Sequence, residues 1–372
     1  MIDRRTFLSL GAATALLGPA ATARAMHGRL YASCGADRDG RYFLGAFDGS
    51  GETAFRIPLA ERGHDIAFHP VRSEAVVFAR RPGTTMLVVD TEAGSTAVRR
   101  EAAPGRHYYG HGVFTPDGRV LYVTENDVDR GAGMIGIYDA EDTYRRIGEF
   151  PTGGIGPHQP RLMPDGASLA IANGGILTRP DTGRAKLNIE TMAPSLAVLS
   201  LRDGRPLWRY ELPEALHKLS IRHLDVNRTG LIAFAMQYEG DVRDRVPLVA
   251  FARAGGEVAF AAGPADLDRQ MKQYTGSVAF DRSGAWLAVS SPRGSTVGLW
   301  DAAHGTFVRN LPARDASGLA AGPLPGTFLL TGGDGSIWLV SAIDGAETAL
   351  RAADREIQWD NHLASRALSP PA

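Results

Sequence analysis

An all-β fold, a seven-bladed β-propeller, is predicted by three features of this 372-residue sequence. A module of four short apolar strands recurs six times along the chain. Turn residues recur at the same place in each module, and the 44 glycines exceed the usual share. The segments left over at the two ends together make a seventh module. We expect a single propeller domain over residues 26–372, behind a leader at residues 1–25.

The complete modules share one order of elements. They begin at Gly63, Gly110, Pro157, Arg222, Gly276 and Gly318. In each, a short strand, a tight turn, an apolar strand, a polar loop and a second apolar strand follow one another, and an outer strand such as "STAVRR" completes the unit. Inner strands such as "VLYVT" and "STVGLW" are β-branched and aromatic, as strands prefer. Apolar residues show no 3.6-residue period, which excludes a helical solenoid.

The turn between the first two strands has a fixed chemistry. Pro116-Asp117-Gly118 and Pro164-Asp165-Gly166 combine a proline, whose φ is fixed, with a glycine where φ is positive. Gly230, Gly284 and Gly326 repeat this glycine in later modules. These turns predict a hairpin at the start of each module.

The two chain ends predict the closure of the ring. Residues 28–59, "GRLYASCGADRDGRYFLGAFDGSGETAFRIPL", supply three strands, and "WDNHLASRAL" near the C-terminus supplies one innermost strand. Joined, they form the seventh blade, as ring-shaped repeat folds require when they protect their sheet edges.

Residues 1–25 predict an export signal of the twin-arginine type. Arg4 and Arg5 precede a short apolar stretch, and Ala23-Arg24-Ala25 provides a small-x-small cleavage site. The apolar stretch is shorter than the roughly 18 to 20 residues of a membrane span, and no second one of that length follows. We therefore expect a periplasmic protein, exported already folded, with no membrane span after cleavage.

Composition and missing motifs exclude several functions. Lys+Arg of 40 against Asp+Glu of 41 leaves no basic surface for nucleic acid. The chain contains no C-x-x-C-H for covalent haem, no G-x-S-x-G, no phosphate-binding G-x-x-x-x-G-K and no H-E-x-x-H. Cys34, the single cysteine, lies in the apolar run "LYASCGA" and is predicted to be a small core residue.

Several motifs resemble known propeller families. The spacing from Gly110-His111 to Tyr138-Asp139 resembles WD-repeat blades, and "LYVTEN" resembles the YVTN-type repeat. Over nearly the whole chain, "YGHGVFTPDGRVLYVTEND", "GGIGPHQPRLMPDG", "KLNIETMAPSLA" and "WDNHL" resemble an uncharacterised family of twin-arginine-exported seven-bladed propellers associated with imelysin-type iron-uptake proteins. The resemblance implies a periplasmic location and, by association, a protein partner in an iron-uptake system.

Propeller geometry predicts which residues meet at the mouth of the central channel. The innermost strands line this channel, and five of the seven carry a histidine at a similar point: His64, His111, His158, His223 and His362. Neighbouring positions and loops on the same face add Arg80, Arg81, Glu125, Asn126, Asp127, Asn173, Arg222, Gln237, Tyr238, Glu239, Arg293 and Asn361.

Two interpretations of the histidines stay open. Each imidazole could hydrogen-bond within its own blade and hold strands together. Alternatively, His111, His223 and His362, with Asp127, Glu125 or Asp360 nearby, could hold a transition metal such as iron, copper or zinc. When the modules are aligned by their turns, His64 and His158 precede the His111 and His223 positions by one residue. Adjacent strand residues point to opposite sides, so this register predicts that only a subset faces the channel.

A long insertion falls on the same face. Residues 174–195, "GGILTRPDTGRAKLNIETMAPS", are longer than a hairpin needs and form either a simple surface loop or a lid that offers Arg184 and Lys186 to an anionic ligand. We predict a non-catalytic periplasmic protein that binds a ligand, a metal or a partner at this face, in connection with iron or metal uptake. The alternative is a metal-assisted enzyme, lactonase-like or dehydrogenase-like, that uses His111.

Overall fold

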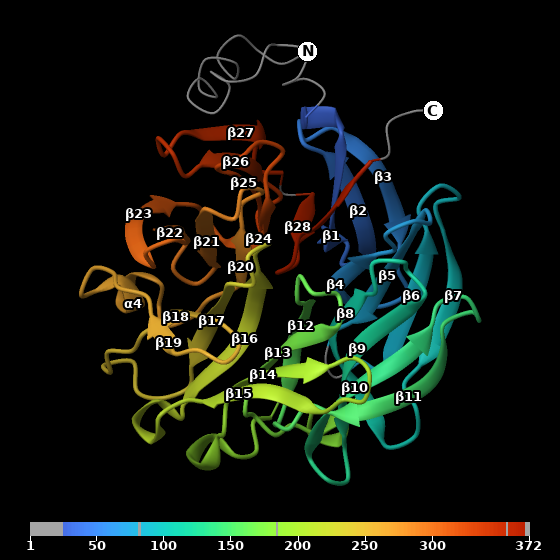
Figure 1. Ribbon diagram of the computed structural model, residues 1–372. Helices are drawn as coiled ribbons and strands as arrows, with labels where there is room; N and C mark the ends of the chain where they lie inside the picture. Colours follow the sequence, from blue (N-terminus) through green and yellow to red (C-terminus); the bar gives the residue numbers. More distant parts are fainter. Residues whose placement is uncertain (1–24, 81–82, 184, 355, 369–372) are drawn as a thin grey trace.

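Seven antiparallel blades, six with four strands and one with five, form a closed ring around a central axis (Figure 1). This computed structural model describes residues 25–80, 83–183, 185–354 and 356–368. The predicted all-β, seven-bladed propeller is therefore confirmed.

The blades are numbered along the ring from the blade that contains the N-terminal strands. Blade 1 contains β1 (Arg29–Asp37), β2 (Tyr42–Asp48), β3 (Thr53–Pro58), β28 (Ile357–Trp359) and β29 (Ala364–Ala367). Blade 2 contains β4 (Gly63–Phe68), β5 (Glu74–Ala79), β6 (Thr85–Asp90) and β7 (Ser95–Glu101). Blade 3 contains β8 (Arg106–Phe114), β9 (Val120–Asp127), β10 (Ala132–Asp139) and β11 (Arg145–Pro151). Blade 4 contains β12 (Pro157–Leu162), β13 (Ser168–Asn173), β14 (Ser195–Ser200) and β15 (Pro206–Glu211).

The remaining blades follow the same order. Blade 5 contains β16 (Leu219–Val226), β17 (Ile232–Tyr238), β18 (Val249–Ala252) and β19 (Val258–Phe260). Blade 6 contains β20 (Ser277–Phe280), β21 (Trp286–Ser291), β22 (Thr296–Asp301) and β23 (Thr306–Pro312), and blade 7 contains β24 (Ala316–Ala321), β25 (Thr327–Gly332), β26 (Ile337–Ser341) and β27 (Glu347–Arg351). The helical elements in the loops are η1 (Pro180–Thr182), η2 (Ile189–Thr191), η3 (Glu214–Leu216) and α4 (Leu267–Gln270).

The two chain ends close the ring in blade 1, as predicted. β28 and β29 both pair antiparallel with β1, so they act as two halves of one innermost strand. The interruption between them, residues 360–363, contains His362. Because β1 is sandwiched between this divided strand and β2, the blade depends on residues more than 300 positions apart.

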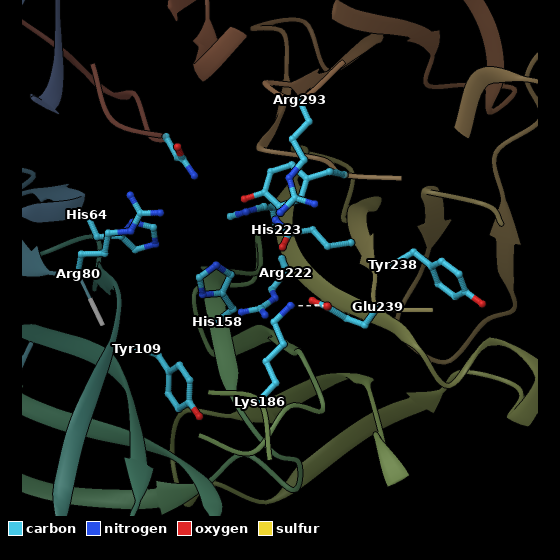
Figure 2. Close-up of a pocket in the computed structure, with 13 residues that line it drawn as sticks. His64, Arg80, Tyr109, His158, Lys186, Arg222, His223, Tyr238, Glu239 and Arg293 are labelled. Atoms are coloured by element: carbon cyan, nitrogen blue, oxygen red, sulfur yellow. Dashed lines mark hydrogen bonds and ion pairs between the residues drawn. The ribbon is translucent and has the colours of Figure 1, made fainter. Parts of the chain in front are cut away.

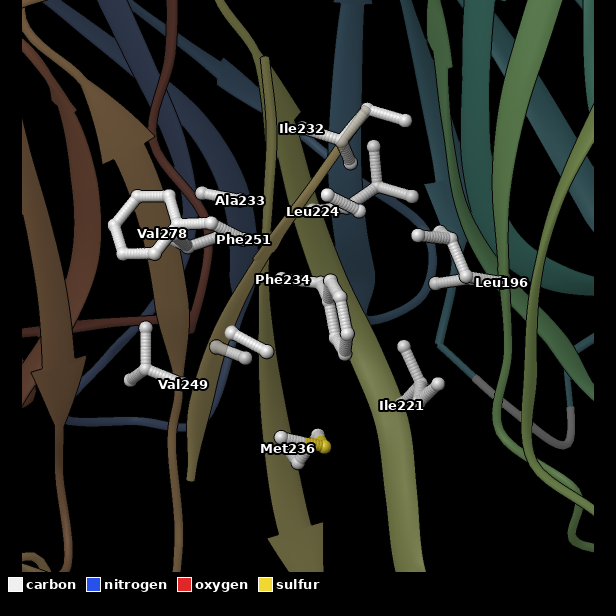
Figure 3. Close-up of a cluster of buried hydrophobic side chains, with 14 of the residues drawn as sticks. Leu196, Ile221, Leu224, Ile232, Ala233, Phe234, Met236, Val249, Phe251 and Val278 are labelled. Carbon is white, nitrogen blue, oxygen red and sulfur yellow. The ribbon is translucent and has the colours of Figure 1, made fainter. Parts of the chain in front are cut away.

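The core lies between neighbouring blades. Side chains of a strand alternate between its two faces, and in a blade each face packs on a different neighbour. Figure 3 shows such a cluster around Phe234 of β17, with Leu196 of blade 4 and Val278 of blade 6 in the same group. Full burial of each large apolar side chain contributes about 1.5–3 kcal/mol, so stability comes from packing between blades.

The predicted turn chemistry is also present. Gly118 has a φ of 76°, in the region that favours glycine. A Cβ atom at this position would lie 2.3 Å from Cε1 of His69, so the turn also packs too closely for a side chain.

The predicted leader falls almost entirely on residues 1–24, which lie outside the described residues. The first described part, residues 25–27, is helical, and Met26 is buried against a cluster that includes Tyr31 and Leu324. Within the described parts of the chain, no helix is long and apolar enough to cross a membrane.

Cys34 is buried in the cluster between blades 1 and 2, as predicted for a core residue. Burial raises the pKa of its thiol well above the ordinary value, and the nearby Asp360 and Asp65 raise it further. The thiolate is the reactive form, so we expect no reaction of native protein with a thiol reagent such as Ellman's reagent at pH 8. One thiol per chain should react after denaturation with guanidinium chloride; rapid labelling of the native protein would contradict the packing.

Candidate functional site

Five histidines meet at the channel. The ring of His111 lies near all four others, with centroid distances of 4.9 Å to His64, 4.5 Å to His158, 6.0 Å to His223 and 4.7 Å to His362. His64 and His362 are 4.5 Å apart, and His158 and His223 are 4.9 Å apart. All five side chains are buried. We call these five residues the histidine cluster.

The prediction that only a subset of these histidines faces the channel is wrong. The reason is a β-bulge in each innermost strand of blades 2 to 5. Gly63 of β4 pairs with Ala79 of β5, and the next pair is Ile66 with Val77. β4 therefore advances by three residues where β5 advances by two. Comparable irregularities lie at Tyr108/Gly112 in β8, Pro157/Pro160 in β12 and Ile221/His223 in β16. An extra residue in a strand re-aims the neighbouring side chains, so the simple alternation on which the prediction relied does not hold here.

A carboxylate orients the central histidine. Nδ1 of His111 lies 2.8 Å from Oδ2 of Asp65, and both side chains are buried. Burial raises the pKa of Asp65, but the charge interaction and hydrogen bond with His111 outweigh burial and hold that pKa below its usual value. The other ring nitrogen of His111, Nε2, is buried and has no hydrogen-bond partner. Asp65 therefore fixes the ring with its free nitrogen turned away from the carboxylate.

The other four imidazoles also have a buried nitrogen without a hydrogen-bond partner. These atoms are Nδ1 of His64, His158 and His223, and Nε2 of His362. Burial lowers the pKa values of these four histidines, and the neighbouring imidazoles lower them further; for His362 the pKa falls to about 3. At neutral pH these rings are neutral, which is the form that binds metals.

The nitrogens of the cluster form two groups of three. His64, His111 and His158 form one, and His111, His223 and His362 form the other, with the ligand atoms of each group within 4.8 Å of one another. His111 belongs to both. Two nitrogens on one tetrahedral zinc-like ion, bound at 2.0–2.1 Å, are about 3.3 Å apart, so small side-chain rotations would bring either group onto an ion.

A pocket opens directly over the cluster (Figure 2). With the solvent at its mouth it contains about 820 Å³ of space. Its lining residues are His64, Arg80, Tyr109, His158, Lys186, Arg222, His223, Gln237, Tyr238, Glu239, Tyr274, Arg293 and Asn361. The predicted rim residues His64, His158, His223, Arg222, Gln237 and Asn361 are among them, and His111 and His362 contact the histidines of the lining.

Cationic side chains surround this pocket. Arg80 pairs with Asp360 at 3.1 Å, and Lys186 pairs with Glu239. The guanidinium of Arg293 stacks over the ring of Tyr274, 4.0 Å from its centroid. In Figure 2, His64 and Arg80 lie on one side of the space, opposite Arg222 and Arg293.

Four predicted rim residues belong neither to the pocket lining nor to the histidine cluster: Glu125, Asn126, Asp127 and Asn173. Side chains along β9 alternate toward the two neighbouring blades and so do not all reach the channel. Glu125 is fully buried, where it accepts a hydrogen bond of 2.6 Å from the Tyr138 hydroxyl and pairs with Arg146 at 2.8 Å.

The other three make equally local contacts. Asp127 pairs with Arg106 at 3.1 Å, Asn126 donates to the carbonyl of Thr178 at 3.3 Å, and Asn173 donates to the Ser195 hydroxyl at 3.2 Å. The carboxylate beside the cluster is thus Asp65 rather than Glu125 or Asp127, while Asp360 is held by Arg62 and Arg80.

The insertion between β13 and β14 contributes to the pocket through Lys186. It is anchored by Thr178, whose hydroxyl lies 3.1 Å from that of Tyr109, and by the ion pair of Lys186 with Glu239. Arg184 of this insertion and Arg81 lie outside the described residues.

Sequence reasoning missed Asp65 and Tyr109. Asp65 directly follows His64 in β4, and Tyr109 lies two residues before His111 in β8. Their proximity to the predicted histidines was the only available signal, because the bulges decide which neighbours of a histidine also turn toward the channel.

The geometry defines a seven-bladed β-propeller with a buried histidine cluster under a basic pocket. The chain belongs to the DUF1513 family, described as a protein of unknown function, whose profile matches residues 57–366. A comparison with curated proteins gave no match.

Solved structures share the fold. Kuenenia stuttgartiensis hydrazine synthase matches with a TM-score of 0.61 and 15% identity, covering 86% of this chain and 95% of that chain. The Myceliophteria thermophila Cps50 (Swd1) β-propeller domain matches with a TM-score of 0.57 and 11% identity, over the same shares. At these identities the likeness concerns the fold alone.

Proposed function

We propose that this propeller binds one transition-metal ion, iron, copper or zinc, in the histidine cluster. The observation that carries the proposal is that each of five buried imidazoles has a ring nitrogen without a hydrogen-bond partner, and that these histidines form two groups of three that share His111. A buried polar atom without a partner costs about 1–3 kcal/mol, and a coordinated ion would satisfy several such atoms at once. Imidazole suits all three metals.

The contact between Asp65 and His111 supports the same function. Histidine ligands of metals commonly donate their second ring N–H to a carboxylate, which fixes the tautomer and makes the ligand more basic. In this chain Nδ1 of His111 lies against Asp65 and leaves Nε2 for the ion.

The metal content of the purified protein tests the proposal. We expect metal-free protein to take up about one Zn²⁺ or Co²⁺ per chain. Isothermal titration calorimetry measures the binding, and elemental mass spectrometry after gel filtration measures the metal that the protein retains. Tetrahedral or five-coordinate Co²⁺ would give visible absorption bands. Failure to retain any of Zn²⁺, Co²⁺, Cu²⁺ or Fe²⁺ would overturn the proposal.

A matched substitution tests the orienting carboxylate. Asp65→Asn keeps the size of the side chain but removes its charge, and we expect metal affinity to fall on the order of tenfold. Asp360→Asn, which alters a carboxylate held by Arg62 and Arg80, should change it much less. Equal effects of the two substitutions would show that Asp65 has no special role.

We also propose that the protein acts in the periplasm, within iron or metal uptake and alongside a protein partner. The twin-arginine motif and the family resemblance support this placement. In a Gram-negative host, the mature protein should fractionate with the periplasm, and a variant with Arg4→Lys and Arg5→Lys should remain cytoplasmic as the precursor. Periplasmic recovery of that variant would count against this route.

A metal-assisted enzyme is the second candidate, favoured by the pocket that opens over the cluster. Three histidines and an open fourth position are typical of catalytic zinc sites. Metal-dependent hydrolysis of a lactone panel, lost in His111→Gln, would support it. Absence of turnover from fully metal-loaded protein would leave the binding function.

A further inference from the structure

The charges around the pocket are unbalanced. Of the described residues, four cationic side chains, Arg80, Lys186, Arg222 and Arg293, line the pocket, but only one carboxylate, Glu239. The whole chain, by contrast, has a formal net charge of −1. Glu239 pairs with Lys186, and Asp360, behind the lining, pairs with Arg80. Among the described residues, Arg293 has no carboxylate within salt-bridge distance.

A metal cation under such a lining needs a compensating anion. The nearest carboxylate, Asp65, is already engaged with His111. A dication bound there would repel the guanidinium groups of Arg222 and Arg293, and this repulsion is weakly screened where water is excluded. An anion placed between the ion and the arginines would remove it.

The lining also has the geometry to bind an anion. Guanidinium groups form paired hydrogen bonds with carboxylate and phosphate oxygens. Arg222 is buried and lies beside His223, while Arg293 is held over Tyr274 at the rim. Tyr109 and Asn361 add further polar groups. Figure 2 shows Tyr109, Arg222 and Arg293 around one open space.

We infer that the pocket binds a small oxyanion, a carboxylate or a phosphate compound, between the histidine cluster and Arg222 and Arg293. Anion binding itself can be measured in the metal-free protein, whereas its coupling to the metal rests on the proposed function.

Titration of metal-free protein with citrate and with inorganic phosphate tests the inference. It also shows whether the pocket prefers a carboxylate or a phosphate. We expect saturable binding of at least one, with Kd below about 1 mM at low salt and weaker binding at 0.3 M salt. The tighter probe identifies the class. No saturable binding of either up to about 10 mM would overturn the inference.

Substitutions locate the site. Arg222→Gln and Arg293→Gln should each raise the Kd for the anion about tenfold, because a charge-assisted hydrogen bond is lost. Arg293 is exposed, so its variant should fold even if the change at buried Arg222 destabilises the protein. Arg119→Gln, which removes an equal charge at an exposed turn, should leave affinity unchanged. If Arg119→Gln lowered the affinity for the anion as much as the pocket substitutions do, the effect would be one of overall charge, and the proposed site would be wrong.

Coupling to the metal is measured with inorganic phosphate on Zn²⁺-loaded protein. We expect at least tenfold tighter binding than to metal-free protein, since the dication adds its charge to the same space. If zinc binds but phosphate affinity is unchanged, the placement of the anion beside the ion is wrong while the metal site stands. If zinc does not bind but the metal-free protein holds the anion, the metal proposal alone fails.

Discussion

Replacing His111 with glutamine is expected to raise the Kd for metal by at least about 100-fold. His111 belongs to both three-histidine groups, so neither group is complete without it. Structural zinc sites in zinc-finger peptides contribute about 10–16 kcal/mol from four ligands, or about 3 kcal/mol for each ligand. Calorimetric titration of the variant, with circular dichroism to confirm that it is folded, measures the loss.

The shared position of His111 makes a sharper prediction about its neighbours. His158→Gln removes only the first group and His362→Gln only the second, so each single variant should lose less than about tenfold in affinity. The double variant should lose as much as His111→Gln. His304→Gln, at an exposed histidine on an outer turn, is the matched control and should bind normally. A His111→Gln variant that binds as well as His158→Gln would contradict the shared site.

Sequence patterns were sufficient for the architecture because each blade repeats the same local rules. Strand pairs separated by a glycine of positive φ, as at Gly118, define hairpins without any long-range information. The closure between β1 and the C-terminal strands was also predictable, since two incomplete modules remained and each lacked what the other had.

The site was less predictable because it depends on departures from the repeat. The bulges in β4, β8, β12 and β16 change which side chains face the channel. The residue pattern of this single sequence did not predict these bulges. Glu125 illustrates the opposite error. Glu125 lies close to a loop in the sequence, which suggested a place on the rim. In the structure, alternation along β9 turns its side chain toward Tyr138 and Arg146.

Replacing Trp359 with alanine is expected to lower the free energy of unfolding by about 3–5 kcal/mol, as for other large buried aromatic residues. Trp359 is the last residue of the three-residue strand β28, which helps to close the ring. Its ring packs edge-on against Phe43 at 5.6 Å and near Phe47 at 5.9 Å, and its indole N–H donates to the Gly335 carbonyl at 3.2 Å. The indole thus joins the C-terminal strand to blades 1 and 7.

The loss of stability in Trp359→Ala is compared with that of a second tryptophan, to separate ring closure from the burial of an aromatic side chain. Trp208→Ala, in the outer strand β15 where the indole is only partly buried and stacks on Tyr210, should cost less than about 1.5 kcal/mol. Urea unfolding followed by circular dichroism compares the two variants. Since no other described strand completes the inner edge of blade 1, Trp359→Ala should also make the segment after Gln358 sensitive to protease before global unfolding. Equal destabilisation by the two substitutions, with no early cleavage, would mean that the C-terminal strands do not hold the propeller closed.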